Sequence, residues 1–138
     1  MINTLRITLM AGHYAESNWH AVLEVDTSTT LQDLHYIIQN AVNFDDDHMY
    51  EFFTARTPRS RLRERYDTDE VDIDTVLVDD VFPLKKGDKL FYLFDFGDDW
   101  LFQISKTRHK PFDPKPGVSY PRLVSEEGER PEQYPPYE

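Results

Sequence analysis

The fold is decided by residues 89–106, KLFYLFDFGDDWLFQISK, the most apolar and aromatic stretch of the chain. In its first half, apolar side chains alternate onto both faces of a strand, with Leu90, Tyr92, Phe94 and Phe96 on one face and Phe91 and Leu93 on the other. A strand that is apolar on both faces is typical of a sheet interior, since an exposed face would carry polar residues. This stretch therefore predicts the central hairpin of the sheet.

The middle of this hairpin is an acidic turn that contains Gly97. Glycine adopts a positive φ at little cost, so we expect Gly97 to make the tight turn. After the turn, apolar and polar residues alternate over 100–105, which predicts a second strand buried on one face. Asp95 alternates onto the face of Phe91, so we expect its carboxylate to be partly buried and to need a partner.

Outward from the hairpin, period-two alternation predicts further strands. Residues 4–10 and 19–26 both alternate in this way, and neighbouring strands with a short link pair antiparallel by default. A third strand is expected at 49–54 and a short one around 71–74. Between them, the polar and proline-containing segment 55–70 predicts a long loop.

One helix is expected between the second and third of these strands. It begins at Thr29 or Thr30, where Thr29 and Gln32 fit a capping box, and it ends near Asn43. Apolar residues recur along it at three- and four-residue spacing, namely Leu31, Leu34, Ile37, Ile38, Ala41 and Val42. This spacing is typical of a helix that packs one face on a sheet.

The chain therefore predicts a single α+β domain. A mixed or antiparallel sheet packs on one main helix, and the order strand, strand, helix, strands is like that of a β-grasp fold. Seven of the nine prolines follow residue 110, so the domain is expected at 1–110 and an extended proline-rich tail at 111–138. The tail is expected either to pack on this domain or to trail from it.

Composition restricts the classes of function. The chain of 138 residues contains no cysteine, which excludes disulfides, thiol catalysis and cysteine-ligated zinc and fits a cytoplasmic location. No signal peptide is seen, and no apolar run approaches the ~20 residues that span a bilayer. The net charge of −11 disfavours nucleic acid and anionic membranes as partners of the whole surface, while it permits a protein partner.

Three blocks of the sequence carry a family resemblance. Residues 30–53, TLQDLHYIIQNAVNFDDDHMYEFF, resemble a pattern TL-x-x-LH-x-x-IQ-x-A that is followed by an acidic or aromatic stretch and H-[LM]-x-x-F. Residues 92–104, YLFDFGDDWLFQI, resemble Y-x-[YF]DFGD-x-W-x-[HF]-x-I, and residues 120–132 resemble a weaker C-terminal block. Together they resemble the plasmid pRiA ORF-3-like family, some of whose members carry transposon-passenger or TnpR-like labels.

The resemblance implies a compact α+β fold, a cytoplasmic prokaryotic protein and an association with mobile-element genes, but no established activity. The sequence departs from the family pattern at two places whose residues a site shared by the family would use. Phe102 stands where a histidine is common, and Trp19 is followed by His20 and Ala21 where an arginine pair is common. The resolvase-like label has no support in the residues, since neither an activated serine among arginines nor a helix-turn-helix is seen.

Candidate site residues lie within the two stronger blocks. They are His35, Gln39, His48, Asp95, Asp98, Asp99 and Trp100. In the functional interpretation, histidines of the helix region meet carboxylates of the central turn across a pocket, as a general base or as metal ligands. In the structural interpretation, His35 is a hydrogen-bonded boundary histidine and the aspartates cap turn amides. Both interpretations stay open on the sequence.

Two charged runs add further candidates. The run Asp45-Asp46-Asp47-His48 offers oxygen ligands to a divalent metal, although its spacing is not that of an EF-hand loop. A cationic patch is formed by Arg56, Arg59, Arg61, Arg63 and Arg65, which could hold phosphate or an acidic partner or could pair with the chain's own carboxylates. No other cofactor motif is present.

Three functions are consistent with the sequence. The first is a non-enzymatic binding or adaptor domain that uses the hairpin, the helix edge or the proline-rich tail as its contact surface. The second is a metal-assisted hydrolase that uses His35, His48, Asp95 and Asp98. The third is a nucleic-acid-associated protein that binds through the arginine loop.

Overall fold

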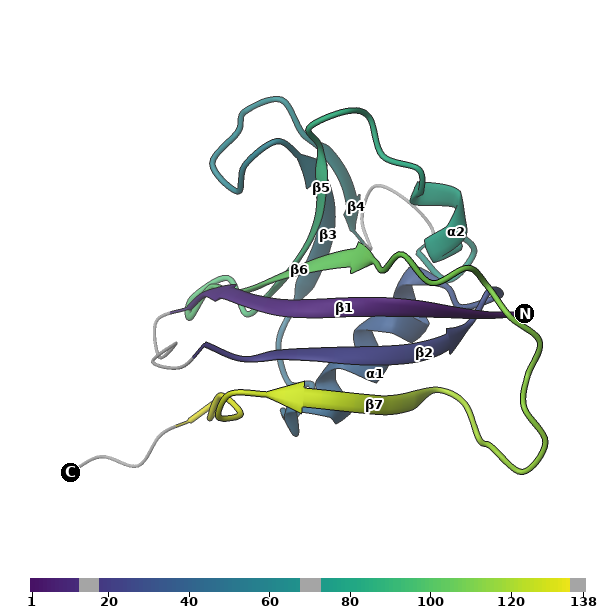
Figure 1. Ribbon diagram of the computed structural model, residues 1–138. Helices are drawn as coiled ribbons and strands as arrows, with labels where there is room; N and C mark the ends of the chain where they lie inside the picture. Colours follow the sequence, from purple (N-terminus) through teal and green to yellow (C-terminus); the bar gives the residue numbers. More distant parts are fainter. Residues whose placement is uncertain (13–17, 68–72, 135–138) are drawn as a thin grey trace.

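The computed structural model describes residues 1–12, 18–67 and 73–134. Its elements in chain order are β1 (Ile2–Ala11), β2 (His20–Asp26), α1 (Leu31–Val42), β3 (Tyr50–Ala55), β4 (Glu64–Asp67), α2 (Val78–Val81), β5 (Lys89–Phe94), β6 (Trp100–Lys106) and β7 (Arg122–Glu127). The strands form one sheet in the order β4-β3-β5-β6-β1-β2-β7, and each pair of neighbours is antiparallel (Figure 1).

The predicted α+β class is wrong. A seven-stranded antiparallel sheet makes up most of the described protein, and beside it stand one helix of 12 residues and one of four. The mixed sheet and the β-grasp-like arrangement are wrong as well, because every described strand pairing is antiparallel. The error has a physical source: β4 and β7 lie in polar segments with little alternation, which indicated a loop and a tail.

The hairpin β5–β6 occupies the centre of the sheet, as predicted, between β3 and β1. Tyr92, Phe94 and Trp100 are fully buried on the face that α1 covers. The opposite face holds a smaller cluster of buried residues, which are Phe53, Ala55, Phe91 and Leu101. β5 ends at Phe94, so Phe96 is 48% exposed and does not continue the alternation.

The turn of this hairpin is made by aspartates rather than by Gly97, which corrects the prediction. Asp95 and Asp99 have positive φ values of 63° and 53°, whereas Gly97 does not have a positive φ. The Asp99 N–H donates to the Asp95 carbonyl at 2.6 Å. The Asp95 carboxylate accepts from the amides of Gly97 and Asp98, at 3.1 and 3.3 Å, which stabilises a conformation that Asp tolerates better than most residues.

Helix α1 starts at Thr30, one of the two positions that the sequence predicts, but its capping box pairs Thr30 with Asp33 and not Thr29 with Gln32. Its N-cap is Thr30, which accepts from the Asp33 N–H at 3.0 Å, while the Asp33 carboxylate accepts from the Thr30 N–H at 3.1 Å. The helix ends at its C-cap residue Asn43, whose backbone is left-handed. This agrees with the predicted end near Asn43. In Figure 1 the helix lies behind β1 and β2, with Leu34 and Ile38 fully buried against the sheet.

Strand β7 lies in the segment that the prolines mark as an extended tail, and it pairs with β2 at one edge of the sheet. The division into 1–110 and 111–138 itself stays a prediction. Of the short strand expected around 71–74, residues 71 and 72 lie outside the described residues. No helix among the described residues is both long and apolar enough to cross a membrane.

Candidate functional site

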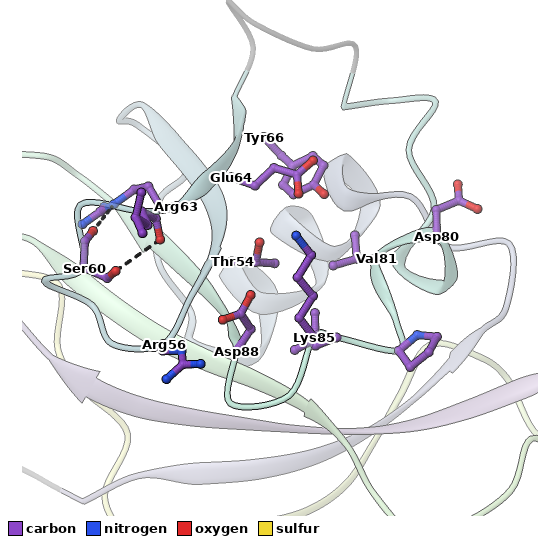
Figure 2. A pocket seen from close by; sticks show the side chains of 13 residues that line it. Thr54, Arg56, Ser60, Arg63, Glu64, Tyr66, Asp80, Val81, Lys85 and Asp88 are labelled. Atoms are coloured by element: carbon purple, nitrogen blue, oxygen red, sulfur yellow. Dashed lines mark hydrogen bonds between the residues drawn. The ribbon is translucent and has the colours of Figure 1, made fainter.

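A hollow of about 660 Å³ lies between the β3–β4 loop and the segment that follows α2 (Figure 2). Thr54, Tyr66 and Val81 contribute to its lining. Charged residues of both signs stand around it, namely Arg56, Arg63, Glu64, Asp80, Lys85 and Asp88. Because three cations face three anions, the hollow shows no net preference for a phosphate or for any other single charge.

The predicted arginine patch is partly used within the chain. Arg63 donates to the carbonyls of Ser60 and Pro58 at 3.0 and 2.8 Å, and its guanidinium lies 4.3 Å from the centre of the Phe53 ring. Arg65 pairs with Glu51 at 3.8 Å. Arg56, Arg59 and Arg61 are exposed. Two of the five arginines are therefore engaged with the protein itself.

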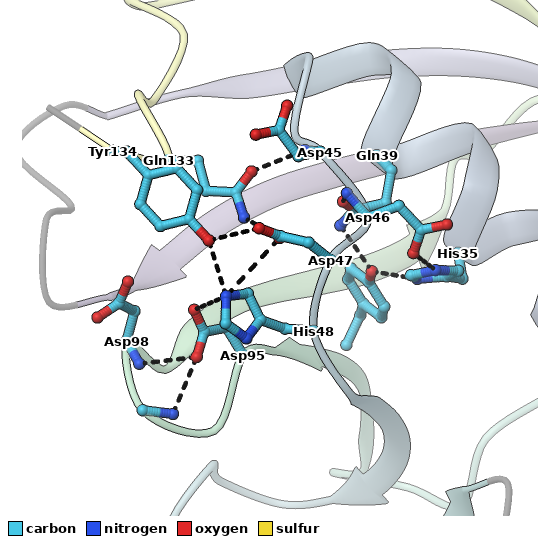
Figure 3. Close-up of polar contacts among 12 residues, drawn as sticks. His35, Gln39, Asp45, Asp46, Asp47, His48, Asp95, Asp98, Gln133 and Tyr134 are labelled. Atoms are coloured by element: carbon cyan, nitrogen blue, oxygen red, sulfur yellow. Dashed lines mark hydrogen bonds and ion pairs between the residues drawn. The ribbon is translucent and has the colours of Figure 1, made fainter.

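The predicted residues His35 and Gln39 meet Tyr92 and Asp46 in a closed ring of hydrogen bonds (Figure 3). Gln39 Nε2 donates to the Tyr92 hydroxyl at 3.0 Å, and this hydroxyl lies 2.5 Å from His35 Nδ1. His35 Nε2 lies 2.6 Å from Asp46 Oδ1, and the Asp46 N–H donates to Gln39 Oε1 at 3.0 Å. One direction of donation around the ring satisfies all four groups when His35 carries its proton on Nε2.

The surroundings of His35 favour this neutral form. The residue is fully buried, and its ring stacks on that of Tyr50 with centroids 3.5 Å apart. Burial lowers the pKa of His35 from its ordinary value, against the opposing effect of the Asp46 carboxylate. Burial also raises the pKa of Tyr92 well above the ordinary value. The ring therefore ties the 44–47 loop to α1 and β5, with the polar atoms of His35, Gln39 and Tyr92 engaged inside the protein.

His48 and Asp95 lie in a second, more exposed cluster beside the first. His48 Nε2 is 3.3 Å from Asp95 Oδ2 and 2.7 Å from the Tyr134 hydroxyl. Asp47 accepts from Tyr134 at 2.7 Å and from Gln133 Nε2 at 2.8 Å, and these bonds lower its pKa from the ordinary value. The cluster clasps the C-terminal segment against the loop that follows α1 (Figure 3).

The seven predicted site residues thus fall into four places rather than one. The Phe94 ring lies about 6 Å from both histidine rings, which contact different carboxylates. Asp98 and Asp99 belong to the turn through their backbone, and Trp100 is fully buried in the core, where its Nε1 finds no partner among the described atoms. Within the described ranges, no three histidine or acidic side chains are placed to hold a metal ion.

A groove of about 370 Å³ lies between α1 and β7, where the helix leaves a corner of the sheet uncovered. Apolar side chains line most of it, namely Leu23, Tyr36, Ile37, Ala41, Pro121 and Leu123. Leu123 stands opposite Leu23 across the β2–β7 pair and therefore points to the same face of the sheet. Tyr36 is 51% and Leu123 37% exposed, so the groove is open to partners.

Sequence reasoning did not identify this groove, although one signal was present. The apolar stripe of α1 includes Ile37 and Ala41, which make it wider than the face that the sheet covers, and both residues are half-buried. The other wall of the groove is β7. Because prolines surround this strand, its sequence predicts an extended tail. Without that strand, no groove could be predicted.

The fold and the two polar clusters define a β-rich domain whose histidines and carboxylates engage each other and their own chain. The family model described as plasmid pRiA4b ORF-3-like protein matches residues 2–134. The chain therefore belongs to this family, and the predicted resemblance is confirmed.

A solved structure shares the fold. It is a protein of unknown function from Methanosarcina mazei Go1, with a TM-score of 0.71 and 23% sequence identity. The similarity covers 91% of this chain and 68% of that one. No curated protein matches the chain. Neither the description of the family nor that of this neighbour names a reaction.

Proposed function

We propose that the protein is a non-enzymatic binding module that holds apolar side chains of a partner protein in the groove between α1 and β7. The observation that carries the proposal is the groove itself, an apolar hollow at the surface of a chain that is otherwise rich in charge. Its lining comes from the helix edge and the proline-rich segment, two of the surfaces that the sequence favours for contact.

The lining of the groove supports a binding role. Binding sites are typically concave, mostly apolar and supplied with a few polar groups that fix orientation. Here Asn40, Arg122 and Arg130 provide those groups. Arg130 is held in place by bonds to Glu126 at 2.5 and 2.9 Å. Exposed aromatic and aliphatic side chains such as Tyr36 and Leu123 are the kinds of residue around which interfaces form.

The polar clusters give the hydrolase alternative no comparable support. His35, Gln39 and Tyr92 are buried and use their polar atoms on each other and on Asp46. A general base needs a free lone pair within reach of a substrate, and none of these three buried side chains offers one. The ring reaches solvent through the Asp46 carboxylate, whose side chain is 40% exposed. The nucleic-acid alternative gains equally little, because the hollow beside the arginine loop carries balanced charge.

The same proposal includes a cytoplasmic location and an association with plasmid or mobile-element genes. The absence of cysteine fits a reducing compartment. The description of the family refers to a plasmid open reading frame, which supports the genetic association.

The proposal is tested by selecting short peptides from a random library against the full chain and against the variant Ala41→Arg. The long arginine side chain fills the groove from a half-buried helix position without lowering helix propensity much. We expect selected peptides to carry apolar anchors and to bind the variant at least about tenfold more weakly, since one buried apolar side chain contributes roughly that much.

The matched control is Leu62→Arg, which places the same side chain at a loop residue that is 90% exposed and remote from the groove. Peptides should bind this variant as they bind the natural chain. A selection that yields no peptide sensitive to Ala41→Arg would remove the basis of the proposed function.

A further inference from the structure

We propose that the protein forms a symmetric dimer in which the β7 strands of two copies pair antiparallel, edge to edge. Arg122 of each copy then stands opposite Glu127 of the other. The inference goes beyond the binding function proposed above and does not depend on it.

Strand β7 has the free edge that such a dimer needs. It ends the sheet, and within the described ranges no strand pairs with its outer side. An unpaired edge presents a row of backbone donors and acceptors that a further strand can satisfy. Leu123 and Val124 leave 37% and 42% of their surface exposed on this short strand, so pairing would also bury apolar area.

An irregularity in β7 decides which side chains share a face. Residues five apart on a regular strand point to opposite faces. The register of β7 against β2 shifts between Leu123 and Ser125, which leaves Val124 as an extra residue. As a result Arg122 faces Glu24, and Glu127 faces His20, on the same side of the sheet.

This placement makes the edge self-complementary. When the two-fold axis passes between Val124 and Ser125, Arg122 of one copy meets Glu127 of the other, and the reverse pair forms as well. Arg122 already contacts Glu24 at 2.8 Å, and Glu127 contacts His20 at 3.2 Å. The dimer therefore extends each contact into a ladder of paired side chains, Glu24–Arg122–Glu127–His20, across the junction of two copies.

The charges of the ladder are available for this role. The side chain of Glu127 is 78% exposed and that of Arg122 is 46% exposed. Opposite charges directly across a strand pair are favourable, and like charges there are unfavourable. Charged residues at a sheet edge usually discourage pairing, but here the sequence Arg-Leu-Val-Ser-Glu-Glu places opposite signs at the two ends of β7.

The test uses two single variants of the full chain, Arg122→Glu and Glu127→Arg, and their equimolar mixture. Each variant alone would set like charges opposite each other twice in its dimer, whereas the mixed dimer restores two opposite-charge pairs. We expect the dimer dissociation constant, measured by light scattering over a concentration series, to rise at least about tenfold for each variant alone. In the mixture it should return to within about threefold of the natural value.

The controls Lys110→Glu and Asp113→Arg make the same changes of charge at exposed residues outside β7 and should leave dimerisation unchanged. A natural chain that scatters as a monomer at every concentration overturns the proposal, as does a mixture no more dimeric than its components. Peptide binding by the groove can be retained in either case, so failure of the dimer is distinguishable from failure of the proposed function.

Discussion

At the scale of single residues, the hydroxyl of Tyr92 is the point where helix and sheet are joined by polar contacts. It accepts from Gln39 and lies next to His35 Nδ1 in a region that the core closes off. Inside a protein, a buried polar group is costly only when it lacks a partner. The closed ring therefore explains how a histidine, a glutamine and a tyrosine are buried together at little cost.

Replacement of Tyr92 by phenylalanine should destabilise the protein by about 1–3 kcal/mol, because His35 Nδ1 loses its donor and Gln39 Nε2 its acceptor in a buried place. The measurement is the free energy of unfolding in urea. The matched control is Tyr36→Phe on α1, where the side chain is 51% exposed and the change should stay within about 0.5 kcal/mol. Equal effects of the two substitutions would show that the ring carries no special stability.

The lowered pKa of His35 predicts a dependence of stability on pH. Its pKa in the folded state lies below the ordinary 6.5, so below that pH the unfolded chain binds more protons than the folded one. Stability should therefore fall as the pH drops from about 6.5 toward the pKa of the folded state. The lowered pKa of Asp47 acts in a different window, since its contribution is lost only as the pH falls below about 3.8.

Urea unfolding between about pH 7.5 and pH 5.5 separates these effects. His35→Gln should flatten the loss of stability over this range, whereas His109→Gln, at an exposed position, should leave it as in the natural chain. The natural chain should lose more unfolding free energy over this range than His35→Gln does. Equal losses in the two proteins would contradict a neutral buried imidazole at His35.

At the scale of elements, the start of α1 depends on one pair of residues. Thr30→Ala should cost about 1 kcal/mol, because the Asp33 amide loses its capping oxygen. Gln32→Ala removes the partner that the sequence pattern suggests instead, and it should change stability by less than about 0.5 kcal/mol. Thermal unfolding of both variants distinguishes the Thr30–Asp33 capping box from the Thr29–Gln32 box. A larger loss of stability for Gln32→Ala than for Thr30→Ala would refute the observed cap.

Prediction from the sequence succeeded where side-chain pattern alone sets the structure. The strands at 4–10, 19–26 and 49–54 and the buried face of α1 follow from period two and period 3.6, and the structure confirms them. It failed at β4 and β7, which are edge strands. An edge strand is held by its backbone bonds to one neighbour and is mostly polar, so its sequence looks like that of a loop.

The candidate site was likewise predictable in part. The sequence selected His35, Gln39, His48 and Asp95 as candidate binding residues, and in the structure each of them makes polar contacts within the chain. Polar side chains within apolar blocks must find such partners, and a binding role for these residues stays a prediction. Their division into a buried ring and a surface clasp depends on Asp46 and on Gln133 and Tyr134, which no spacing rule connects to them. Contacts between segments some 90 residues apart are set by tertiary packing and not by local pattern.

At the scale of the whole molecule, the segment after residue 110 completes the sheet. Strand β7 covers the edge of β2, and Glu126 accepts from the indole N–H of Trp19 at 3.1 Å. Gly128 sits so close to the backbone of Asn18 that a Cβ there would clash, at 1.8 Å from its carbonyl oxygen. These contacts indicate that β7 is held specifically and that the domain depends on it.

A chain that ends at Lys110 should therefore be less stable and prone to association. It loses β7, so strand β2 becomes a free edge, and the buried Trp19 indole loses its bond to Glu126. Free strand edges pair with other chains. We expect the unfolding midpoint to fall by at least about 5 °C and high-molecular-weight species to appear in size-exclusion chromatography. The matched control ends at Tyr134, which keeps β7 and the clasp to Asp47, and should behave as the full chain. If the chain that ends at Lys110 stays monomeric with an unchanged midpoint, then the segment beyond it is a separable tail and the sheet is complete with six strands.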